Sequence, residues 1–179
     1  MLILFAGNVG SGKTTLAARL SADFGIPLYE VDRLKRELYP LDPDFERNMQ
    51  ESIPFKDETR MTAYRRACEE LKAMAASHPH VLVDEAMHKR IFRETFRTAA
   101  EPFGGSYLIL VRISEETMRR RLTPEARPGH MVRDPLAMAL ALEKQSEPMD
   151  DEADLVVDND GPPEEAYARI LRALSPLLA

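Results

Sequence analysis

The sequence has a single cysteine, Cys68, and no tryptophan among its 179 residues. One thiol can form neither an internal disulfide nor a cysteine-rich zinc site, and such cysteine usage fits a reducing compartment. No uncharged apolar run approaches the roughly 18 residues of a membrane-spanning helix. The opening run MLILF is short and has no basic residue before it, unlike a secretory signal. We therefore expect a cytoplasmic protein with no membrane partner.

An excess of positive charge is also missing. Lys and Arg together number 24 and Asp and Glu 30, which gives a net charge of −6. Because nucleic-acid binding needs a basic face, this balance disfavours a nucleic-acid partner. The 44% of hydrophobic and 30% of charged residues are typical of a globular domain. The length predicts one domain, residues 1–179, which we expect to be a monomer or a homodimer.

Apolar runs alternate with helical patterns along the chain. Short buried strands are predicted at 2–6, 27–31, 81–83, 107–113 and 155–157. Between and after them, apolar residues at helical spacing or helix-start signals predict helices near 13–24, 32–39, 57–75, 91–99, after Ser114, after Asp134 and at 163–174. Strands that alternate with helices at this interval predict an α/β fold with a parallel sheet of about five strands and helices on both faces.

The first predicted strand runs into a glycine-rich motif. Gly7-Asn-Val-Gly-Ser-Gly-Lys-Thr14 fits the phosphate-loop (P-loop) pattern G-x-x-x-x-G-K-S/T without a mismatch. Glycines let the backbone N–H groups wrap around phosphate oxygens, and the following helix points its positive end at the same anion. Lys13 would bridge the β- and γ-phosphates, and the Thr14 hydroxyl would bind Mg²⁺. The motif thus predicts a nucleoside triphosphate site, formed by Gly7, Asn8, Val9, Gly10, Ser11, Gly12, Lys13, Thr14 and Thr15.

With this motif and this order of elements, the whole chain resembles the P-loop kinases of the nucleoside-monophosphate-kinase type, which include adenylate, shikimate and gluconate kinases. It is most similar to small predicted-kinase ATPases related to the kinase half of polynucleotide kinase. The resemblance implies a P-loop three-layer sandwich. It also implies transfer of the γ-phosphate of Mg-ATP to a hydroxyl or phosphate of a small-molecule acceptor. The chain has no N-K-x-D loop for guanine, so ATP is favoured over GTP.

Carboxylates follow the second and third predicted strands. Asp32 is expected at the carboxyl edge of the sheet, where the resemblance implies that it orients the acceptor hydroxyl and accepts its proton. It would also be placed to cap the helix that follows. Asp84 resembles a Walker B aspartate, which reaches Mg²⁺ beside Thr14 if the third strand lies next to the P-loop strand. Glu85 favours hydrolysis over transfer, because a glutamate in this place positions water in many ATPases.

Arginines supply the remaining candidates. Arg33 and Arg36 lie within one helical turn after Asp32, where they either hold an acidic substrate or form a solvated helix face. Arg93 is a further candidate substrate contact. Five arginines lie between 119 and 133, where the resemblance implies an arginine-bearing lid over 121–134. The resemblance implies that Arg121 contacts the nucleotide and that Arg127, brought in when the lid closes, stabilises the transferred phosphoryl group.

Two further segments take their expected roles from position. Asn159 follows the fifth strand, where the relatives hold adenine. Residues 40–57 contain three prolines and no clear period, so we expect a mobile or substrate-covering segment there.

Two other functions remain open at this stage. Residues 26–33 and 145–161 resemble dephospho-coenzyme A kinase, although residues 81–87 do not match that family's third-strand motif. The chain could instead be a nucleotide-dependent ATPase or switch with no acceptor, a reading for which Glu85 is the main support. The absence of an arginine-finger region of the kind found in oligomeric ATPases argues against this second alternative.

Overall fold

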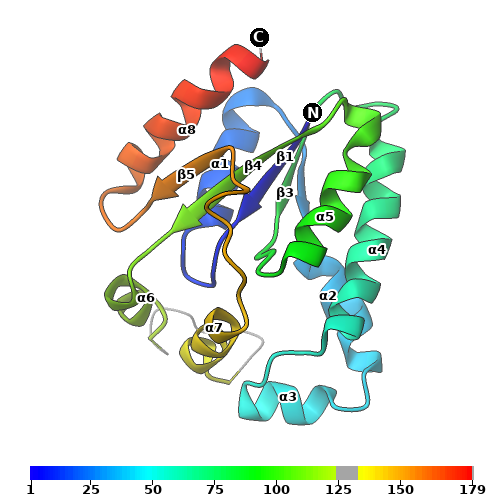
Figure 1. Cartoon of the computed structure of the whole chain (residues 1–179), viewed down its shortest axis with the longest axis vertical. Helices are drawn as coiled ribbons and strands as arrows, with labels where there is room; N and C mark the ends of the chain where they lie inside the picture. The colour runs from blue at the N-terminus through cyan, green and yellow to red at the C-terminus, as the bar shows by residue number, and fades with distance from the viewer. Residues whose placement is uncertain (124–132, 179) are drawn as a thin grey trace.

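The computed structural model describes residues 1–123 and 133–178, which fold around one parallel sheet. Its strands are β1 (Leu2–Ala6), β2 (Leu28–Glu30), β3 (Val81–Asp84), β4 (Ser106–Arg112) and β5 (Leu155–Asp158). They lie in the order β2-β3-β1-β4-β5, and every neighbouring pair is parallel (Figure 1). Parallel neighbours need crossover connections, which is why helices separate the strands in sequence. The predicted α/β fold is confirmed.

The carboxyl ends of β1 and β3 lie side by side. Phe5 of β1 is in register with Asp84 of β3, which confirms that the third strand is the neighbour of the P-loop strand. From this edge the chain leaves in opposite directions. β1 leads to α1 (Lys13–Phe24) on one face of the sheet, whereas β3 leads to α5 (Arg90–Ala99) on the other. Such a divergence opens the crevice in which open α/β sheets bind ligands.

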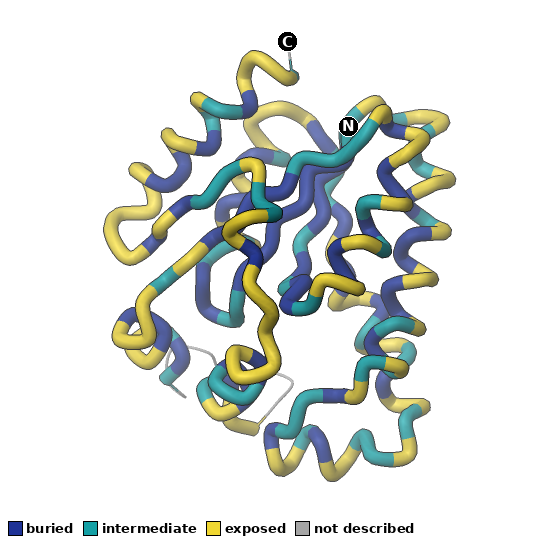
Figure 2. The backbone as a smooth tube through the Cα atoms, viewed as in Figure 1, coloured by how far each residue is buried: buried dark blue, intermediate teal, exposed yellow. Residues whose placement is uncertain are grey.

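Two hydrophobic cores flank the sheet, because successive residues of a strand face opposite sides. Leu2 and Leu4 of β1 pack into one core and Ile3 and Phe5 into the other. The first core takes in α2 (Asp32–Leu38), α4 (Asp57–Met74) and α5, and the second takes in α1 and α8 (Pro163–Leu178). Figure 2 shows the buried strands between these layers. Along residues 1–123 and 133–178, no helix is long and apolar enough to cross a membrane.

Segment 40–57 is more regular than its sequence suggests. It follows a 3₁₀ turn, η1 (Tyr39–Leu41), and contains a short helix, α3 (Phe45–Glu51). Phe45 and Met49, one turn apart, pack with Tyr39 and Phe55 in a small core of their own. A helix of seven residues is too short to stand out as a periodic pattern, which explains why the sequence shows no clear period here.

The remaining helices begin where the sequence predicts. Ser114 and Asp134 each accept the backbone N–H three residues later, at 3.2 and 2.9 Å, and so cap the helices that follow them. These helices are α6 (Glu115–Arg121) and α7 (Pro135–Lys144), and a second 3₁₀ turn, η2 (Glu101–Phe103), precedes β4.

Candidate functional site

The P-loop occupies residues 7–12, between β1 and α1, and its backbone admits only glycine at two tight positions. Gly7 has a φ of 144°, and a Cβ there would lie 2.3 Å from the carbonyl oxygen of Val111. Gly12 has a φ of 87°, and a Cβ there would lie 2.5 Å from Nδ2 of Asn159. Both the dihedral angles and the lack of space exclude a larger residue. The predicted glycine pattern therefore reflects close packing around the loop as well as its conformation.

Two predicted nucleotide contacts support the loop from outside. Nη1 of Arg121 donates to the carbonyl oxygens of Gly10 and Ser11 at 3.3 and 3.4 Å. Nδ2 of Asn159 donates to the same Ser11 carbonyl at 2.7 Å, and Nη2 of Arg121 donates to the Asn159 carbonyl at 2.7 Å. Carbonyls held on the outside of the loop cannot turn toward a bound phosphate. By holding these carbonyls, Arg121 and Asn159 leave the concave side of the loop to backbone N–H groups, which can bind phosphate.

The other residues of the predicted nucleotide site either contact neighbouring helices or are exposed to solvent. Nδ2 of Asn8 donates to the Ala139 carbonyl of α7 at 3.2 Å, and Val9 packs against apolar residues of α6 and α7. Thr14 and Thr15, in contrast, are exposed at the start of α1. The loop is therefore braced by the helices on both sides of the predicted lid.

Lys13, Thr14 and Asp84 come together at the edge of the sheet. Burial raises the pKa of Asp84, against the charge of Lys13 and a hydrogen bond from Thr14, which both lower it. Oδ1 of Asp84 is buried and has no hydrogen-bond partner within the described part of the chain. A buried carboxylate oxygen beside a hydroxyl is a donor set that Mg²⁺ accepts together with phosphate oxygens and water. The residues present therefore fit the predicted magnesium site.

Asp32 faces the same group of charges from the first turn of α2. Its pKa is lowered by Lys35, whose Nζ lies 3.0 Å from Oδ1, and further by Lys13 and Arg36. The side chain is 68% exposed, so it is accessible to a ligand. Asp32 does not cap α2, because Val31 occupies the cap position and no side chain caps the helix. The capping role considered for Asp32 is therefore not the one that the structure shows, and its role at the acceptor stays a prediction.

Lys35, which the sequence analysis did not single out, links Asp32 to Glu85. Its Nζ lies 2.5 Å from Oε2 of Glu85, which is only 2% exposed. Burial alone would lower the pKa of Lys35, but Glu85 and Asp32 raise it well above its usual value. Oε1 of Glu85 accepts the Tyr64 hydroxyl at 3.0 Å and the Ala86 N–H at 2.8 Å. Oε1 of Glu85 is therefore hydrogen-bonded and Oε2 is in the ion pair with Lys35, so this buried residue is poorly placed to position water.

Arg33 and Arg36 lie on the solvent side of α2. The guanidinium of Arg33 is 58% exposed and pairs with Glu70 of α4, near the ring of Tyr29. Arg36 is exposed, and its charge helps to lower the pKa of Asp32. The structure thus keeps Arg36 close to the site and turns Arg33 toward α4.

Arg93 is placed differently from what the sequence predicted. Its side chain is fully buried and donates to Glu152 and to the carbonyl oxygens of Met87 and Pro148. Arg93 thereby fastens residues 145–154, which connect α7 to β5 and which we call the strap, to α5. The expected substrate contact is corrected: a guanidinium with no exposed surface and four hydrogen bonds to protein groups is a structural residue. The position of Arg93 on the predicted helix 91–99 could not reveal this.

The predicted lid over 121–134 is only partly visible. Arg127, its expected catalytic residue, lies outside the described residues. At the far end, the N–H of Arg133 donates to the Met49 carbonyl at 3.4 Å, and the N–H of Asp134 donates to Oγ of Ser52 at 3.1 Å. The end of the predicted lid therefore contacts segment 40–57, the predicted covering segment.

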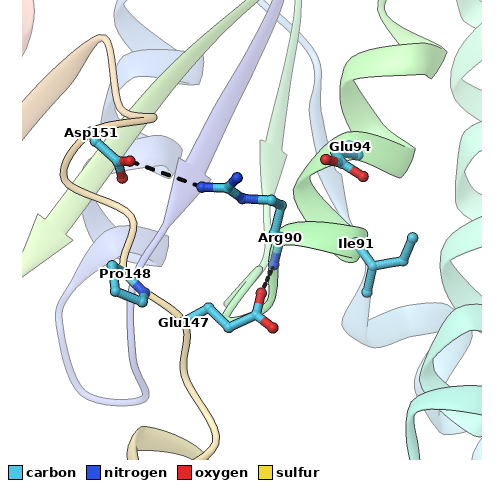
Figure 3. Close-up of a pocket in the computed structure, with 6 residues that line it drawn as sticks. All are labelled: Arg90, Ile91, Glu94, Glu147, Pro148 and Asp151. Atoms are coloured by element: carbon cyan, nitrogen blue, oxygen red, sulfur yellow. Dashed lines mark hydrogen bonds and ion pairs between the residues drawn. The ribbon is translucent and has the colours of Figure 1, made fainter.

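A surface hollow of about 580 Å³ lies between α5 and the strap (Figure 3). Figure 3 shows Arg90 between Glu147 and Asp151, and Oε2 of Glu147 accepts the Arg90 N–H. These charged groups are engaged in fastening the strap. The hollow lacks the convergent free polar groups that mark a binding site.

Comparison with known proteins agrees with this geometry. Residues 2–146 match a protein family described as an AAA domain. No protein of curated function matches the chain significantly. A sugar kinase structure from Janibacter sp. HTCC2649 is similar over 99% of this chain and 97% of that one, with a TM-score of 0.75 and 27% identity.

Two further solved structures extend the comparison. A gluconokinase from Sinorhizobium meliloti 1021 matches with a TM-score of 0.75 and 26% identity over 98% of this chain and 92% of that one. Shikimate kinase from Acinetobacter baumannii, in complex with shikimate, matches with a TM-score of 0.64 and 19% identity over 99% and 95%, which shows the fold alone. The predicted resemblance to P-loop small-molecule kinases is confirmed, whereas the nucleoside-monophosphate type is not singled out.

Proposed function

The chain belongs to the AAA domain family of P-loop proteins, and from this premise we propose that it is an ATP-dependent kinase that phosphorylates a hydroxyl group of a small molecule. The observation that carries the proposal is the convergence of Lys13, Thr14 and Asp84 with Asp32 at the crevice between β1 and β3. The similarity to a sugar kinase and a gluconokinase, each over nearly the whole chain, supports transfer to a hydroxyl.

The nucleotide end of the site works through preorganised charge. The N–H groups of the P-loop and the ammonium of Lys13 would bind the β- and γ-phosphates of ATP. Mg²⁺, held by Thr14 and Asp84, would neutralise charge on the same phosphates when bound. The hydrogen bonds from Arg121 and Asn159 to the loop carbonyls hold the loop in its binding shape before ATP arrives. The loop then needs no reorganisation during phosphoryl transfer.

The acceptor end works through Asp32. Because its pKa is lowered, Asp32 is a carboxylate at neutral pH and can accept a hydrogen bond from the acceptor hydroxyl. The acceptor oxygen attacks the γ-phosphorus, the bond from that phosphorus to the bridging oxygen of ADP breaks, and the hydroxyl proton passes to Asp32. Lys35 keeps the Asp32 carboxylate in place through its second bond to Glu85.

Transfer is favoured over hydrolysis by the state of Glu85. The glutamate that would activate water is buried and paired with Lys35 and Tyr64. Asp32, which is exposed, is the carboxylate left to act on an incoming group. We therefore place the reaction among transfers to an acceptor rather than among acceptor-free ATPase cycles.

The test measures ADP release with Mg-ATP alone and with a panel of sugars, sugar acids and dephospho-coenzyme A. We expect ADP release to depend on an acceptor. Asp32→Asn should reduce that release roughly 10²- to 10⁴-fold and leave ATP binding intact. Asp151→Asn, which changes an exposed acid on the strap, is the matched control and should be silent. Acceptor-independent hydrolysis that survives Asp32→Asn would instead identify an ATPase or switch.

A further inference from the structure

Arg60, in the first turn of α4, is a buried cation with no acidic partner among the described residues. It is 5% exposed, and its Nε donates to the Phe55 carbonyl at 3.1 Å. Among residues 1–123 and 133–178, no carboxylate lies within ion-pair distance of its guanidinium. Arg93, which is also buried, is by contrast paired with Glu152. Because an unpaired buried charge is costly, Arg60 calls for an explanation other than fold stability.

Arg60 fixes the state of the neighbouring His88. Nη1 of Arg60 lies 3.3 Å from Nδ1 of His88, and a guanidinium can only donate. Nδ1 is therefore the acceptor, and the ring proton of neutral His88 sits on Nε2. Burial lowers the pKa of His88 to about 3, with further lowering by Arg60 and Lys89, so the ring is neutral at physiological pH. Nε2 is buried and has no partner in the described structure, which leaves one N–H donor unused.

His88 lines a cavity of about 440 Å³ beside the P-loop. Gly7 and Ser11 form part of the same lining, and so do Ala86, Leu142 and Met149. Oγ of Ser11 is also buried without a partner, so two unused polar atoms belong to residues of one largely apolar cavity. The volume falls within the roughly 300–1,000 Å³ of small-molecule sites. Such a combination is what a binding site for a small polar ligand requires.

The cavity shares the P-loop residues Gly7, Asn8 and Ser11 with the nucleotide site proposed above, whereas Asp32 and Asp84 are not among its lining residues. Ala86, in its wall, follows Asp84 by two residues, and the P-loop forms another side. The buried Tyr39 hydroxyl, also without a partner in the described part, is acted on by the charges of Lys35, Arg60 and Asp32. Arg60 and Asp32 therefore belong to one electrostatic neighbourhood. A ligand that reached from His88 toward Asp32 would lie next to the P-loop.

The acidic residues of the cavity stand at its exposed rim. These are Glu143, Glu147 and Asp150. Asp150 pairs with Arg112, and Glu147 accepts the Arg90 N–H. His88 lies at the inner end of the cavity, and Arg60 contacts it from behind, outside the lining, so this end differs in charge from the rim. An anionic group would be favoured at that inner end.

We propose that this cavity holds the phosphoryl acceptor and that His88, backed by Arg60, selects an acceptor with an anionic oxygen group on a hydroxylated small molecule. The inference rests on the proposed kinase function and narrows its substrate class. Nε2–H of His88 donates to the anionic oxygen, and the charge of Arg60 favours an anion over a neutral group. The hydroxyl to be phosphorylated lies at the opposite end of the ligand, toward Asp32. A carboxylate and a phosphate ester share this chemistry.

The test uses three compounds of equal chain length: D-gluconate, D-glucitol 6-phosphate and neutral D-glucitol. Binding to the full chain is measured by calorimetry in the presence of Mg²⁺ and a non-hydrolysable ATP analogue. We expect at least one anion to bind roughly 10-fold or more tightly than D-glucitol, since hydrogen bonds to charged groups are the stronger ones. Which anion binds distinguishes a carboxylate from a phosphate subsite.

Variants then separate recognition from stability. Arg60→Met should weaken anion binding roughly 10- to 150-fold without changing D-glucitol binding, and it should not lower the melting temperature, because an unpaired buried charge is removed. His88→Leu should act in the same direction, whereas His88→Gln, which can place an N–H near Nε2, should retain part of the affinity. Arg65→Met, an exposed arginine of the same helix, is the control.

Several outcomes would overturn the inference. Equal or tighter binding of D-glucitol would do so, as would an Arg60→Met variant that melts lower but discriminates normally. Failure of both anions to bind would also overturn it, even if a neutral acceptor were phosphorylated and the kinase proposal stood. Anion binding that depends on Arg60, without any phosphoryl transfer, would instead uphold the subsite and count against the kinase.

Discussion

The two ends of the candidate site are built in different ways. The nucleotide end is one continuous stretch of backbone, residues 7–12, whose carbonyl oxygens accept hydrogen bonds from the Arg121 guanidinium and the Asn159 amide. The acceptor end is assembled from side chains of α2, α4 and the residues after β3, and it depends on charges such as the half-buried Lys35 and the buried Glu85. We expect a site built from backbone groups to lose ligand binding when a substitution blocks its backbone conformation. A charge-assembled site should fail when one partner is removed.

The largest effect is expected from breaking the Lys35–Glu85 pair. Glu85→Gln removes the buried partner of the half-buried Lys35, leaves only the exposed Asp32 to pair with it, and should lower the free energy of unfolding by about 3–5 kcal/mol. The double variant Lys35→Met/Glu85→Leu should recover most of that loss, because apolar side chains replace the whole pair, yet it should still transfer phosphate slowly, since Asp32 has lost its partner. Urea unfolding and turnover measure the two properties. A single Glu85→Gln variant within about 1 kcal/mol of the wild type would contradict this view.

Acid should loosen the strap, which contributes to the wall of the cavity. Hydrogen bonds and the charge of Arg93, aided by Arg97 and Arg90, lower the pKa of Glu152 to about 2 from an ordinary value of 4.5. Because the folded pKa is the lower one, this stabilisation is complete above about pH 4.5 and is lost as the pH falls toward 2. Glu152→Gln should cost about 3 kcal/mol at pH 7, and the difference from the wild type should shrink with acid.

Thermal unfolding of Glu152→Gln between pH 7 and pH 3 measures this prediction. Asp151→Asn, the exposed neighbour on the same strap, is its control and should change the melting temperature little at any pH. A constant difference between Glu152→Gln and the wild type across this range would show that the charge of Glu152 is not what fastens the strap.

The nucleotide end should be sensitive to a single methyl group. Gly12→Ala imposes a left-handed conformation that costs about 1–2 kcal/mol, and its Cβ also meets Nδ2 of Asn159 at 2.5 Å. Gly104→Ala is the matched control, because its φ of 77° is similar and no atom lies within 4 Å of its Cβ. We expect both variants to lose stability but only Gly12→Ala to lose ATP binding, measured by calorimetry. Equal ATP binding by the two would show that the packing around the loop is dispensable.

The smallest effect is expected at the surface of α2. Arg33 pairs with Glu70 in an exposed position, so Arg33→Ala should change the free energy of unfolding by at most about 1 kcal/mol. If Arg33 has no part in acceptor binding, the KM for the acceptor is also unchanged. A rise in KM of roughly 10-fold or more, with normal stability, would restore Arg33 as a substrate contact.

Some features of the two ends of the site could be predicted from the sequence, and others could not. The P-loop, the parallel sheet and the position of Asp84 beside β1 were predictable, because each depends on residues close together in the chain or on a general rule of strand connection. The role of Arg93 was not, since periodicity places a residue on a helix without saying whether a carboxylate 59 positions away will bury it. For Lys35 the sequence offered one weak indication, because this residue lies three positions after Asp32 in the predicted helix 32–39.

The sequence by itself determined the phosphate-binding loop, because a glycine pattern specifies dihedral angles locally and those angles create the site. Only the tertiary structure decided that Glu85 is a buried partner of Lys35, that Arg93 binds the strap, and that Arg60 contacts His88 and no carboxylate of the described residues. The sequence specifies which side chains carry a charge. The burial and the partner of each such side chain depend on helices and strands that come into contact only on folding. Burial and pairing together decide whether a charged residue stabilises the protein or remains available to bind a ligand.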